Sequence, residues 1–553
     1  MSIYQRQIEV IEAVVKKLLF TQNRDPYSKT FGCFDRHYWA WKLTDFPEAT
    51  YQRNVYTLAW FLEHGGPHSI EAKSELEIAI RAGLEFSTSI QHQNGSFDQA
   101  FPNENSFGAT AFMVHPLLAS LEIAEKHFPG DWTLEIGLAL RRSADFLARF
   151  EETHAFISNH LAAAALSLLY AESRWGEKYG LQSDQFVSAI IHRQSSEGWF
   201  LEYDGADPGY QSLCIYYLSQ CQIMRPREEL ALALLSAVEF ISWFIHPDGT
   251  FGGEYGSRRT SVCYLGGLGL LGVTNPLASA FVYEALAGQA VGKLLTCMEV
   301  DMGNLAPLTA NHMLLVECIK RLVIPSELPW QRPNAFRYFK DAGIFVRGEG
   351  KGYVVIGLSA GAVVKIFDKT NRRLIVDDSG YLGIIKEDNK ITTQITQIPI
   401  VETATSENLV FETQFFKLLD DIQTPYRMIL LRALNLTLMR NISIGNLIKG
   451  LLVRRLISKK QSAGLMLKRE IQFKEGGVHF VDRISYSTFP FRLKLLERGR
   501  RFVGMHMASS RYFSGFLDSC LSLSYAARRQ QLDVNKLSSE GFLENSWAVF
   551  YSE

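Results

Sequence analysis

The chain has 553 residues, a formal net charge of −1 and 47% hydrophobic residues. A single hydrophobic core stops growing near about 250–300 residues, so at least two domains are expected. The hydrophobic content excludes an intrinsically disordered chain, and the balanced charge gives no reason to expect nucleic acid as a partner.

The seven cysteines are scattered and include no Cys-x-x-Cys pair. They therefore provide neither a zinc site nor a disulfide framework, and we expect no metal and no cofactor. The first ten residues lack a basic segment followed by an apolar one, so no signal peptide is predicted and a cytoplasmic location is expected. The most apolar stretch, 263–291, is broken by five glycines and Pro276, which favours a buried helical hairpin over an integral membrane segment. Nothing in the sequence indicates the oligomeric state.

Residues 1–325 are predicted to form one helix after another. Apolar residues recur at helical spacing in eight segments, and roughly a dozen helices are expected in all. The eight segments are Ile8–Leu19, Val55–Leu62, Ile78–Phe86, Ala109–Ile123, Leu134–Phe150, Leu161–Tyr170, Leu213–Ile223 and Leu230–Phe244.

Three turns between these helices repeat a polar-Gly-x-Phe pattern. They are Asn94–Phe97, Glu197–Phe200 and Asp248–Phe251, and their glycines lie 103 and 51 residues apart. These separations are close to two units and one unit of about 51 residues, a period that indicates an array of helical hairpins. Six such hairpins close into a ring, so we predict an (α/α)6 toroid, complete or incomplete, as the substrate-binding domain.

The pattern changes after Pro325. Together with Pro325, Pro329 and Pro333 mark a linker over 326–340. Residues 341–553 are predicted to be an antiparallel β-sandwich, since short β-branched runs alternate with polar turns. The expected strands are Ile344–Val346, Tyr353–Leu358, Ala362–Phe367, Leu374–Val376, Lys390–Ile398, Leu409–Phe415, Ile471–Phe473 and Val478–Tyr486. One segment inside this domain, 440–460, is basic and amphipathic. It fits a solvated helix inserted between strands, or a contact with anionic lipid or polysaccharide.

Two early loops combine charged, polar and aromatic residues. The first contains Arg36, His37 and Trp39, and the second contains Asp98 and Asn103. A cation for a carboxylate and a ring for a sugar face suit an acidic saccharide, whereas capping of the following helices would explain the same residues structurally.

Three later loops carry the strongest candidates. Asn159 and His160 stand at the start of a predicted helix, whose positive end attracts carboxylates; Ser158 or Asn159 would cap it. The next two loops are rich in glycine, which lets the backbone approach a ligand. They supply the remaining candidates, namely Glu202, Tyr203, Asp204, Asp207, Tyr210, Glu254, Tyr255 and Arg258.

These loops resemble those of the heparinase II/III-like and alginate-lyase-like polysaccharide lyases. Asn159-His160 is similar to their Asn-His pair, and Gly198–Tyr217 is similar to their loop with the catalytic tyrosine. The resemblance implies a toroid-plus-sandwich protein acting on an acidic, uronate-containing poly- or oligosaccharide. It implies catalytic roles for Asn159, His160 and Tyr210.

The implied reaction begins with removal of the weakly acidic C5 proton of a uronate. Asn159, His160 and Arg258 would neutralise the carboxylate, and Tyr210 would act as base, as acid, or as both. Because a tyrosine has an ordinary pKa near 10, a nearby cation would have to stabilise the phenolate. Such lyases often carry a His-x-His motif in the sandwich, and the corresponding segment here, Val354–Lys365, has no histidine.

Three other functions remain open at this point. A glycoside hydrolase would use a pair of carboxyl groups drawn from Asp98, Asp204, Asp207 and Glu254. A uronyl epimerase would abstract the same proton as the lyase, and a non-catalytic protein of polysaccharide biosynthesis would keep the fold alone.

Overall fold

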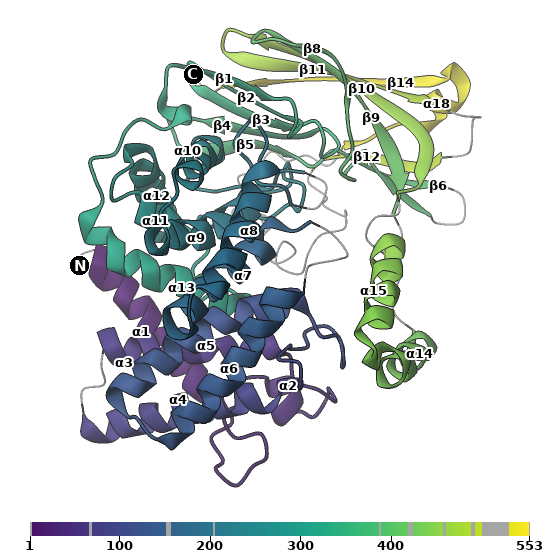
Figure 1. The fold of residues 1–553 in the computed structure, drawn as a ribbon. Coiled ribbons are helices and arrows are strands. Elements are labelled where there is room, and N and C mark those ends of the chain that lie inside the picture. Colours follow the sequence, from purple (N-terminus) through teal and green to yellow (C-terminus); the bar gives the residue numbers. More distant parts are fainter. Residues whose placement is uncertain are drawn as a thin grey trace.

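The structure is a computed structural model of the whole chain. It describes residues 3–65, 69–150, 156–202, 205–385, 389–418, 424–456, 460–487, 493–499 and 530–551. In Figure 1 the helices of the first half lie below two β-sheets, and a separate pair of helices stands beside the first half.

The first half is helical, as predicted. Besides the short helices α2 (Arg36–Trp39) and η1 (Ala49–Asn54), the described residues contain twelve longer helices. They are α1 (Ile3–Thr21), α3 (Val55–His64), α4 (Ile70–Ser89), α5 (Phe107–His127), α6 (Asp131–Arg149), α7 (Ser158–Trp175), α8 (Lys178–His192), α9 (Pro208–Met224), α10 (Glu228–Ser242), α11 (Leu265–Leu271), α12 (Pro276–Ala290) and α13 (Met302–Cys318).

The helices form a closed double ring. Helices α3, α5, α7, α9, α11 and α13 contact one another in this order, and α13 contacts α3 again. Helices α4, α6, α8, α10, α12 and α1 pack outside them, one against each inner helix. The inner helices are apolar on nearly every side, as in α7 with its buried run Ala162–Ala165, whereas outer helices such as α6 are amphipathic. The predicted (α/α)6 toroid is therefore present and complete.

The repeated turns need their glycines. Gly95, Gly198 and Gly249 have φ values of +93°, +97° and +84°, a region that side chains disfavour. A Cβ atom on Gly95 or Gly198 would also lie 2.1 or 2.2 Å from a backbone carbonyl oxygen of an outer helix. Gly32, with φ +92° and Phe34 two residues later, is a fourth such turn. This turn does not match the polar-Gly-x-Phe pattern, because Phe31 and not a polar residue precedes the glycine.

The second half contains two antiparallel sheets. The first has the order β1-β2-β3-β4-β5, and the second has the order β13-β12-β6-β7-β9-β10-β11-β14, with β8 paired to β9. The strands are β1 (Asn334–Phe339), β2 (Ile344–Glu349), β3 (Gly352–Gly357), β4 (Val363–Asp368), β5 (Arg373–Asp378), β6 (Tyr381–Ile385), β7 (Lys390–Thr392), β8 (Ile400–Ala404), β9 (Asn408–Lys417), β10 (Ser462–Lys474), β11 (Gly477–Tyr486), β12 (Leu493–Arg498), β13 (Gln530–Gln531) and β14 (Phe542–Phe550), with helix α18 (Val534–Glu540) before β14. Strand β1 falls inside the range 326–340 that the prolines assigned to a linker, so the first sheet begins earlier than predicted.

The first sheet packs against the toroid on one face and against the second sheet on the other. Phe339 of β1 contacts Phe240 and Phe244 near the end of α10, and the Tyr353 hydroxyl of β3 donates to the Trp243 carbonyl at 2.7 Å. One continuous core therefore joins the toroid to this sheet, and a second core lies between the two sheets. This arrangement confirms the predicted order of helical toroid followed by β-sandwich.

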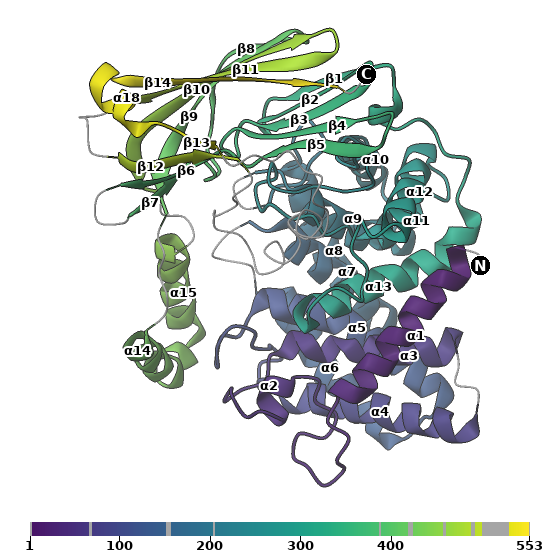
Figure 2. The ribbon, with the colours of Figure 1, turned by 180° about the vertical axis from the view of Figure 1, so that it is seen from behind.

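Two helices are inserted between β9 and β10. Helix α14 spans Pro425–Leu436, and helix α15 spans Ile442–Leu456, where the basic amphipathic pattern predicted a helix. Figures 1 and 2 show both helices outside the sheets and next to the α2 end of the toroid. We call α14 and α15, with the turn between them, the basic helix pair.

Among the described residues, one helix is long and apolar enough to cross a membrane by length and composition, namely α5. Most of its apolar window, 78%, is buried inside the toroid, as expected for an inner helix of a ring. The six cysteines within the described part of the chain are all buried and free.

Candidate active site at the inner-helix starts

The toroid brings the connectors that precede the inner helices to one end. Each such connector leads from an outer helix into the next inner helix, and all the loops with candidate residues are of this kind. Neighbouring connectors touch: the Ala49 N–H donates to the Asp98 carbonyl at 3.1 Å, and the Ser257 N–H donates to the Ala206 carbonyl at 2.8 Å. Hairpin ends that are far apart in sequence therefore meet, as the ring prediction requires.

Asn159 is fixed at the start of α7 by a carboxylate. Its Nδ2 donates to Glu202 Oε2 at 2.8 Å, and both side chains are buried. The N-cap residue is Ile157, which has no side-chain cap bond, so the prediction that Ser158 or Asn159 caps this helix is wrong. Ser158 donates instead to the Leu201 carbonyl at 2.6 Å. The two bonds anchor the start of α7 to the connector before α9.

His160 lies between α7 and α5. Its ring meets Phe112 edge to face, with 5.1 Å between the ring centroids. A Cβ atom on Gly108 would come within 2.6 Å of the His160 ring, so the glycine at the start of α5 makes room for the imidazole. His160 is partly exposed at the end of the toroid where the connectors lie.

Tyr210 enters α9 beside its cap. Asp207 is the N-cap residue, and its Oδ1 accepts from the N–H groups of Gly209 and Tyr210, both at 3.1 Å. The Tyr210 side chain is partly buried and packs against the toroid core. The cap therefore sets the position from which Tyr210 leaves the helix.

Asp207 also holds the next connector. Its Oδ2 accepts from the Arg258 N–H at 2.9 Å and from the Thr260 N–H at 3.3 Å. Burial raises the pKa of Asp207 to about 6, against the lowering effect of these N–H groups. This aspartate orients Tyr210 and the backbone of Arg258 rather than reaching out towards a ligand.

Glu254 and Tyr255 turn away from the open end. The Glu254 carboxylate lies 2.8 Å from Lys365 Nζ of β4, and the Tyr255 hydroxyl lies 2.8 Å from Nε2 of His246 in a fully buried position. Both residues connect the toroid to the first sheet. Arg258, three residues further on, is partly exposed beside the Asp207 cap.

The residues of the first loop lie at the rim. Asp35 caps α2, accepting from the His37 N–H at 3.0 Å, and both Arg36 and His37 are exposed. The Trp39 indole N–H donates to the Thr21 carbonyl at 3.1 Å, and the Arg36 guanidinium lies 5.2 Å from the Trp39 ring centroid.

The second loop is largely held by its own bonds. Asp98 accepts from the Asn103 and Asn105 N–H groups at 2.7 and 2.9 Å, and its carboxylate lies 2.8 Å from His92 Nε2. Asn103 donates to the Asn435 carbonyl of the basic helix pair at 3.0 Å. Tyr203 and Asp204 lie outside the described residues.

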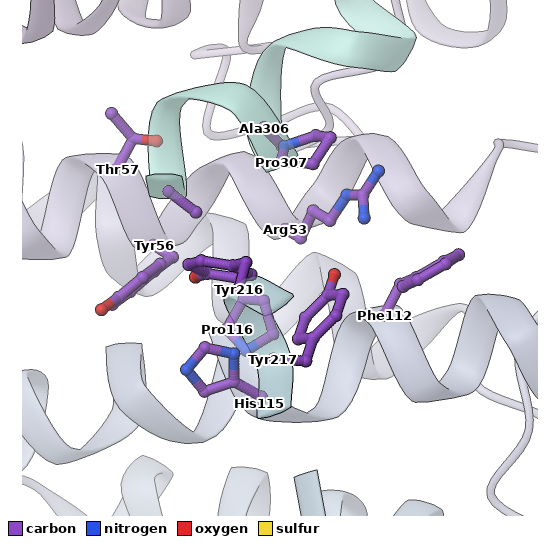
Figure 3. A pocket seen from close by; sticks show the side chains of 11 residues that line it. Arg53, Tyr56, Thr57, Phe112, His115, Pro116, Tyr216, Tyr217, Ala306 and Pro307 are labelled. Carbon is purple, nitrogen blue, oxygen red and sulfur yellow. The ribbon is translucent and has the colours of Figure 1, made fainter. Parts of the chain in front are cut away.

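Several further residues line the inner-helix starts and were not predicted. Figure 3 shows Arg53 at the centre, with the Tyr217 hydroxyl pointing toward it and Phe112 beside them. The Arg53 guanidinium lies 5.3 Å from the Phe112 ring centroid. Its Nε is buried and has no hydrogen-bond partner among the described residues. Arg53 also opposes the burial that raises the pKa of the Glu48 carboxyl group, so this cation already has one acidic neighbour.

Arg53 and Tyr210 both act electrostatically on Tyr264. Burial raises the pKa of Tyr264, Tyr210 raises it further, and Arg53 opposes both. Burial raises the pKa of Tyr217 to about 12, and again Arg53 opposes it. Tyr217 and Tyr264 therefore lie within electrostatic reach of Arg53, and Tyr210 lies within reach of Tyr264. Tyr217 could have been found from the sequence, because it follows Tyr210 by seven residues and lies on the same helix face.

The ring axis behind these residues is nearly filled. A cavity lined by Arg53, Tyr56, His115 and Tyr216 has a free volume of about 10 Å³, close to the space of one water molecule. Burial lowers the pKa of His115 to about 3, so this imidazole is neutral.

No group of three or more His, Cys, Asp or Glu residues within the described ranges is arranged to hold a metal ion. In the strands where the resemblance would place a His-x-His motif, the Lys365 ammonium is bound by Glu254 and by Asp377 at 3.0 Å. Burial alone would lower the pKa of Lys365, yet Asp377 and Glu254 hold it above its ordinary value. The Lys365 ammonium therefore lies in the region where the resemblance would place the two histidines.

No protein-family model matches the chain, and no curated protein sequence matches it either. Among solved structures, the chain is similar to the chondroitin AC lyase of Streptomyces coelicolor A3 in complex with chondroitin sulphate. The identity is 10%, the match covers 99% of this chain and 79% of the lyase, and the TM-score is 0.57.

Two more solved structures are similar over somewhat more than half of this chain. The cellobiose 2-epimerase of Bacillus thermoamylovorans B4167 has 8% identity, covering 56% of this chain and 98% of the epimerase, with a TM-score of 0.42. A D-mannose isomerase has 15% identity, covering 58% of this chain and 97% of the isomerase, with a TM-score of 0.38. At such low identities the match to the lyase establishes the fold alone, a toroid followed by β-sheets.

Proposed function

We propose that the protein is a carbohydrate-active enzyme that cleaves an acidic poly- or oligosaccharide by C5 proton abstraction and β-elimination. The observation that carries this proposal is a cluster in the toroid in which Tyr264 interacts electrostatically with both Tyr210 and Arg53, an arginine whose Nε has no hydrogen-bond partner among the described residues. Elimination from a uronate needs a base next to a cation that neutralises the carboxylate. The likeness of the fold to a lyase for an acidic polymer adds support.

Each residue has a defined task in this reaction. The Tyr210 phenolate takes the C5 proton, the freed electron pair forms the C4–C5 double bond, and the bond from C4 to the glycosidic oxygen breaks. The Tyr210 phenol then returns the proton to the leaving oxygen, which restores the enzyme. Arg53 and His160 bind the carboxylate whose charge grows in the transition state. The hydrogen bond to Glu202 fixes the orientation of the Asn159 side chain.

Hydrolysis is the second candidate, and the carboxyl groups argue against it. Of its four candidate acids, Asp98 is bound by its own loop, Asp207 caps α9 and Glu254 pairs with Lys365. A hydrolase needs one carboxylic acid and one carboxylate that both face the glycosidic bond. Asp204 lies outside the described residues. An epimerase would use the same base as the lyase without breaking the chain.

The reaction class can be separated by product analysis. The full chain is incubated with chondroitin, heparin and alginate oligosaccharides. Elimination creates an unsaturated uronate that absorbs ultraviolet light, and this product is the expected result. New reducing ends without that absorbance would indicate hydrolysis, and deuterium incorporated from solvent at C5 without cleavage would indicate epimerisation. No change with any acidic saccharide would favour a non-catalytic role.

The cellular setting remains a prediction. A cytoplasmic enzyme of this kind would act on imported oligosaccharides or during synthesis of a capsule or O-antigen. Fractionation of cells that express the full chain with a C-terminal tag would test the location.

A further inference from the structure

The basic helix pair differs sharply in charge from the rest of the protein. Between Thr424 and Lys460 the sequence contains eight arginine and lysine residues and no aspartate or glutamate, while the whole chain has a net charge of −1. A segment of 37 residues thus carries eight positive charges, whereas the rest of the chain has a net charge of −9 (−1 − 8). Its counterpart must be an anionic surface.

The same segment exposes large apolar side chains. On α14, Tyr426 and Ile429 are 84% and 67% exposed, and on α15 Leu447 and Leu451 are 66% and 58% exposed. Five further apolar residues of the pair also belong to this exposed set, namely Met428, Leu430, Leu436, Leu438 and Ile444. Single exposed leucines are common, but a run of this kind marks an interaction surface.

The pair is attached to the rim of the candidate site. Arg432 lies 2.9 Å from the Asp45 carboxylate and stacks over Phe46, at 5.7 Å from the ring centroid. The Asn103 side chain donates to the Asn435 carbonyl of the same helix. These contacts fix α14 against the connector end of the toroid and leave its apolar residues outward.

We propose that the basic helix pair binds the surface of an anionic lipid bilayer. Helices that combine exposed aliphatic and aromatic residues with arginine and lysine lie in the headgroup region, where the aliphatic groups enter the acyl boundary and the cations meet lipid phosphates. An acidic polysaccharide would use the cations but offers nothing for the leucines. A second copy of this chain would bring an equally basic segment, which disfavours self-association of two basic helix pairs.

The test is co-sedimentation of the full chain with vesicles. The expected result is binding to vesicles of phosphatidylcholine with about one third phosphatidylglycerol, little binding to pure phosphatidylcholine, and release as salt is raised. The double variant Leu447→Asp/Leu451→Asp should lower the bound fraction about tenfold, because carboxylates replace the inserting side chains.

A matched control is present on the toroid. Leu134 and Leu138 on α6 have the same spacing and are 68% and 61% exposed, so Leu134→Asp/Leu138→Asp should leave vesicle binding unchanged. Equal losses in both variants, or no binding to anionic vesicles, would overturn the proposal. So would wild-type protein that binds only acidic polysaccharide, or a dimer that the Leu447→Asp/Leu451→Asp variant dissociates. The readout needs no catalytic activity, so it is independent of the proposed elimination reaction.

Discussion

Arg53 places a positive charge among the aromatic side chains of the inner helices. It reaches the ring centre from η1, stacks on Phe112 and faces Tyr217. Arginine presents a planar fork of donors that suits a carboxylate, and a cation here also favours a phenolate on a nearby tyrosine. Sequence reasoning did not find it, because Arg53 stands before a helix in a stretch without a glycine-rich loop.

The variant Arg53→Gln should lose the neutralisation of the substrate carboxylate. If elimination occurs, its kcat/KM should fall by about 10²–10³, as for the loss of one oxyanion-stabilising donor. The measurement is the initial rate of unsaturated product with the acidic oligosaccharide. A methyl-esterified substrate is the control, since it has no carboxylate charge for Arg53 to neutralise and should show a much smaller difference between the two proteins. An equal loss on both substrates would contradict the assigned role.

Lys365 is a second cation of the molecule, and its role is structural because two buried carboxylates bind it. Its ammonium pairs with both Glu254 and Asp377, and all three side chains are buried. The variant Lys365→Met would leave two buried carboxylates without their cation, which should lower the free energy of unfolding by about 3–5 kcal/mol. Urea unfolding measures this difference, and Lys340→Met at an exposed site is the control. A loss below about 1 kcal/mol would show that the triad contributes little.

At the scale of single elements, the start of α9 depends on one aspartate. Asp207 bonds to the first turn of the helix and to the connector before α11. The sequence indicated a turn here from Pro208 and Gly209, and the structure adds the reason why Tyr210 is held in place. The four glycine turns have a comparable role, since each allows a connector to cross close to an outer helix.

The raised pKa of Asp207, about 6 in the folded protein, predicts a pH dependence of stability. The ordinary value is about 3.9, so the folded state binds a proton more tightly than the unfolded state. This contribution is complete below about pH 4 and is lost as the pH rises through about 6. Two pKa units correspond to about 3 kcal/mol.

The matched comparison is with Asp207→Asn, which has no titrating group at this position. The unfolding free energy of the wild type minus that of the variant should increase by up to about 3 kcal/mol as the pH falls from 7 to 4. Denaturant unfolding at several pH values measures it. A difference that stays constant over this range would show that Asp207 keeps an ordinary pKa in the folded protein.

At the scale of the whole molecule, the toroid and the first sheet share one core. Phe339 and Tyr353 from the sheet are buried against α10 and Trp243, so separating the parts would expose apolar surface on both. We expect α9–α10 and β2–β4 to unfold together. Hydrogen exchange at rising urea concentration should give peptides from both regions the same midpoint. Sheet peptides that open well before the helices would contradict a shared core.

Sequence and structure agree on the larger elements for a physical reason. Helical periodicity and the glycine turns are local signals, and they were enough for the ring and for most helices. Helix α8 was missed because its apolar positions are interrupted by polar residues, and β1 was missed because Pro333 suggested a linker. Which side chains face the ring centre depends on packing between helices far apart in sequence. Glu254 and Tyr255 illustrate this, since only the sheet shows why they turn inward.

In the proposed reaction, Tyr210 abstracts the C5 proton at the open end of the toroid. The most direct measurement is single-turnover formation of unsaturated product by Tyr210→Phe, with Tyr283→Phe on the outer helix α12 as control. Removal of the only proton-transfer group should slow elimination by about 10²–10⁴, with unchanged thermal stability, while the control keeps the wild-type rate. Elimination at the wild-type rate by Tyr210→Phe would show that Tyr210 does not transfer the proton.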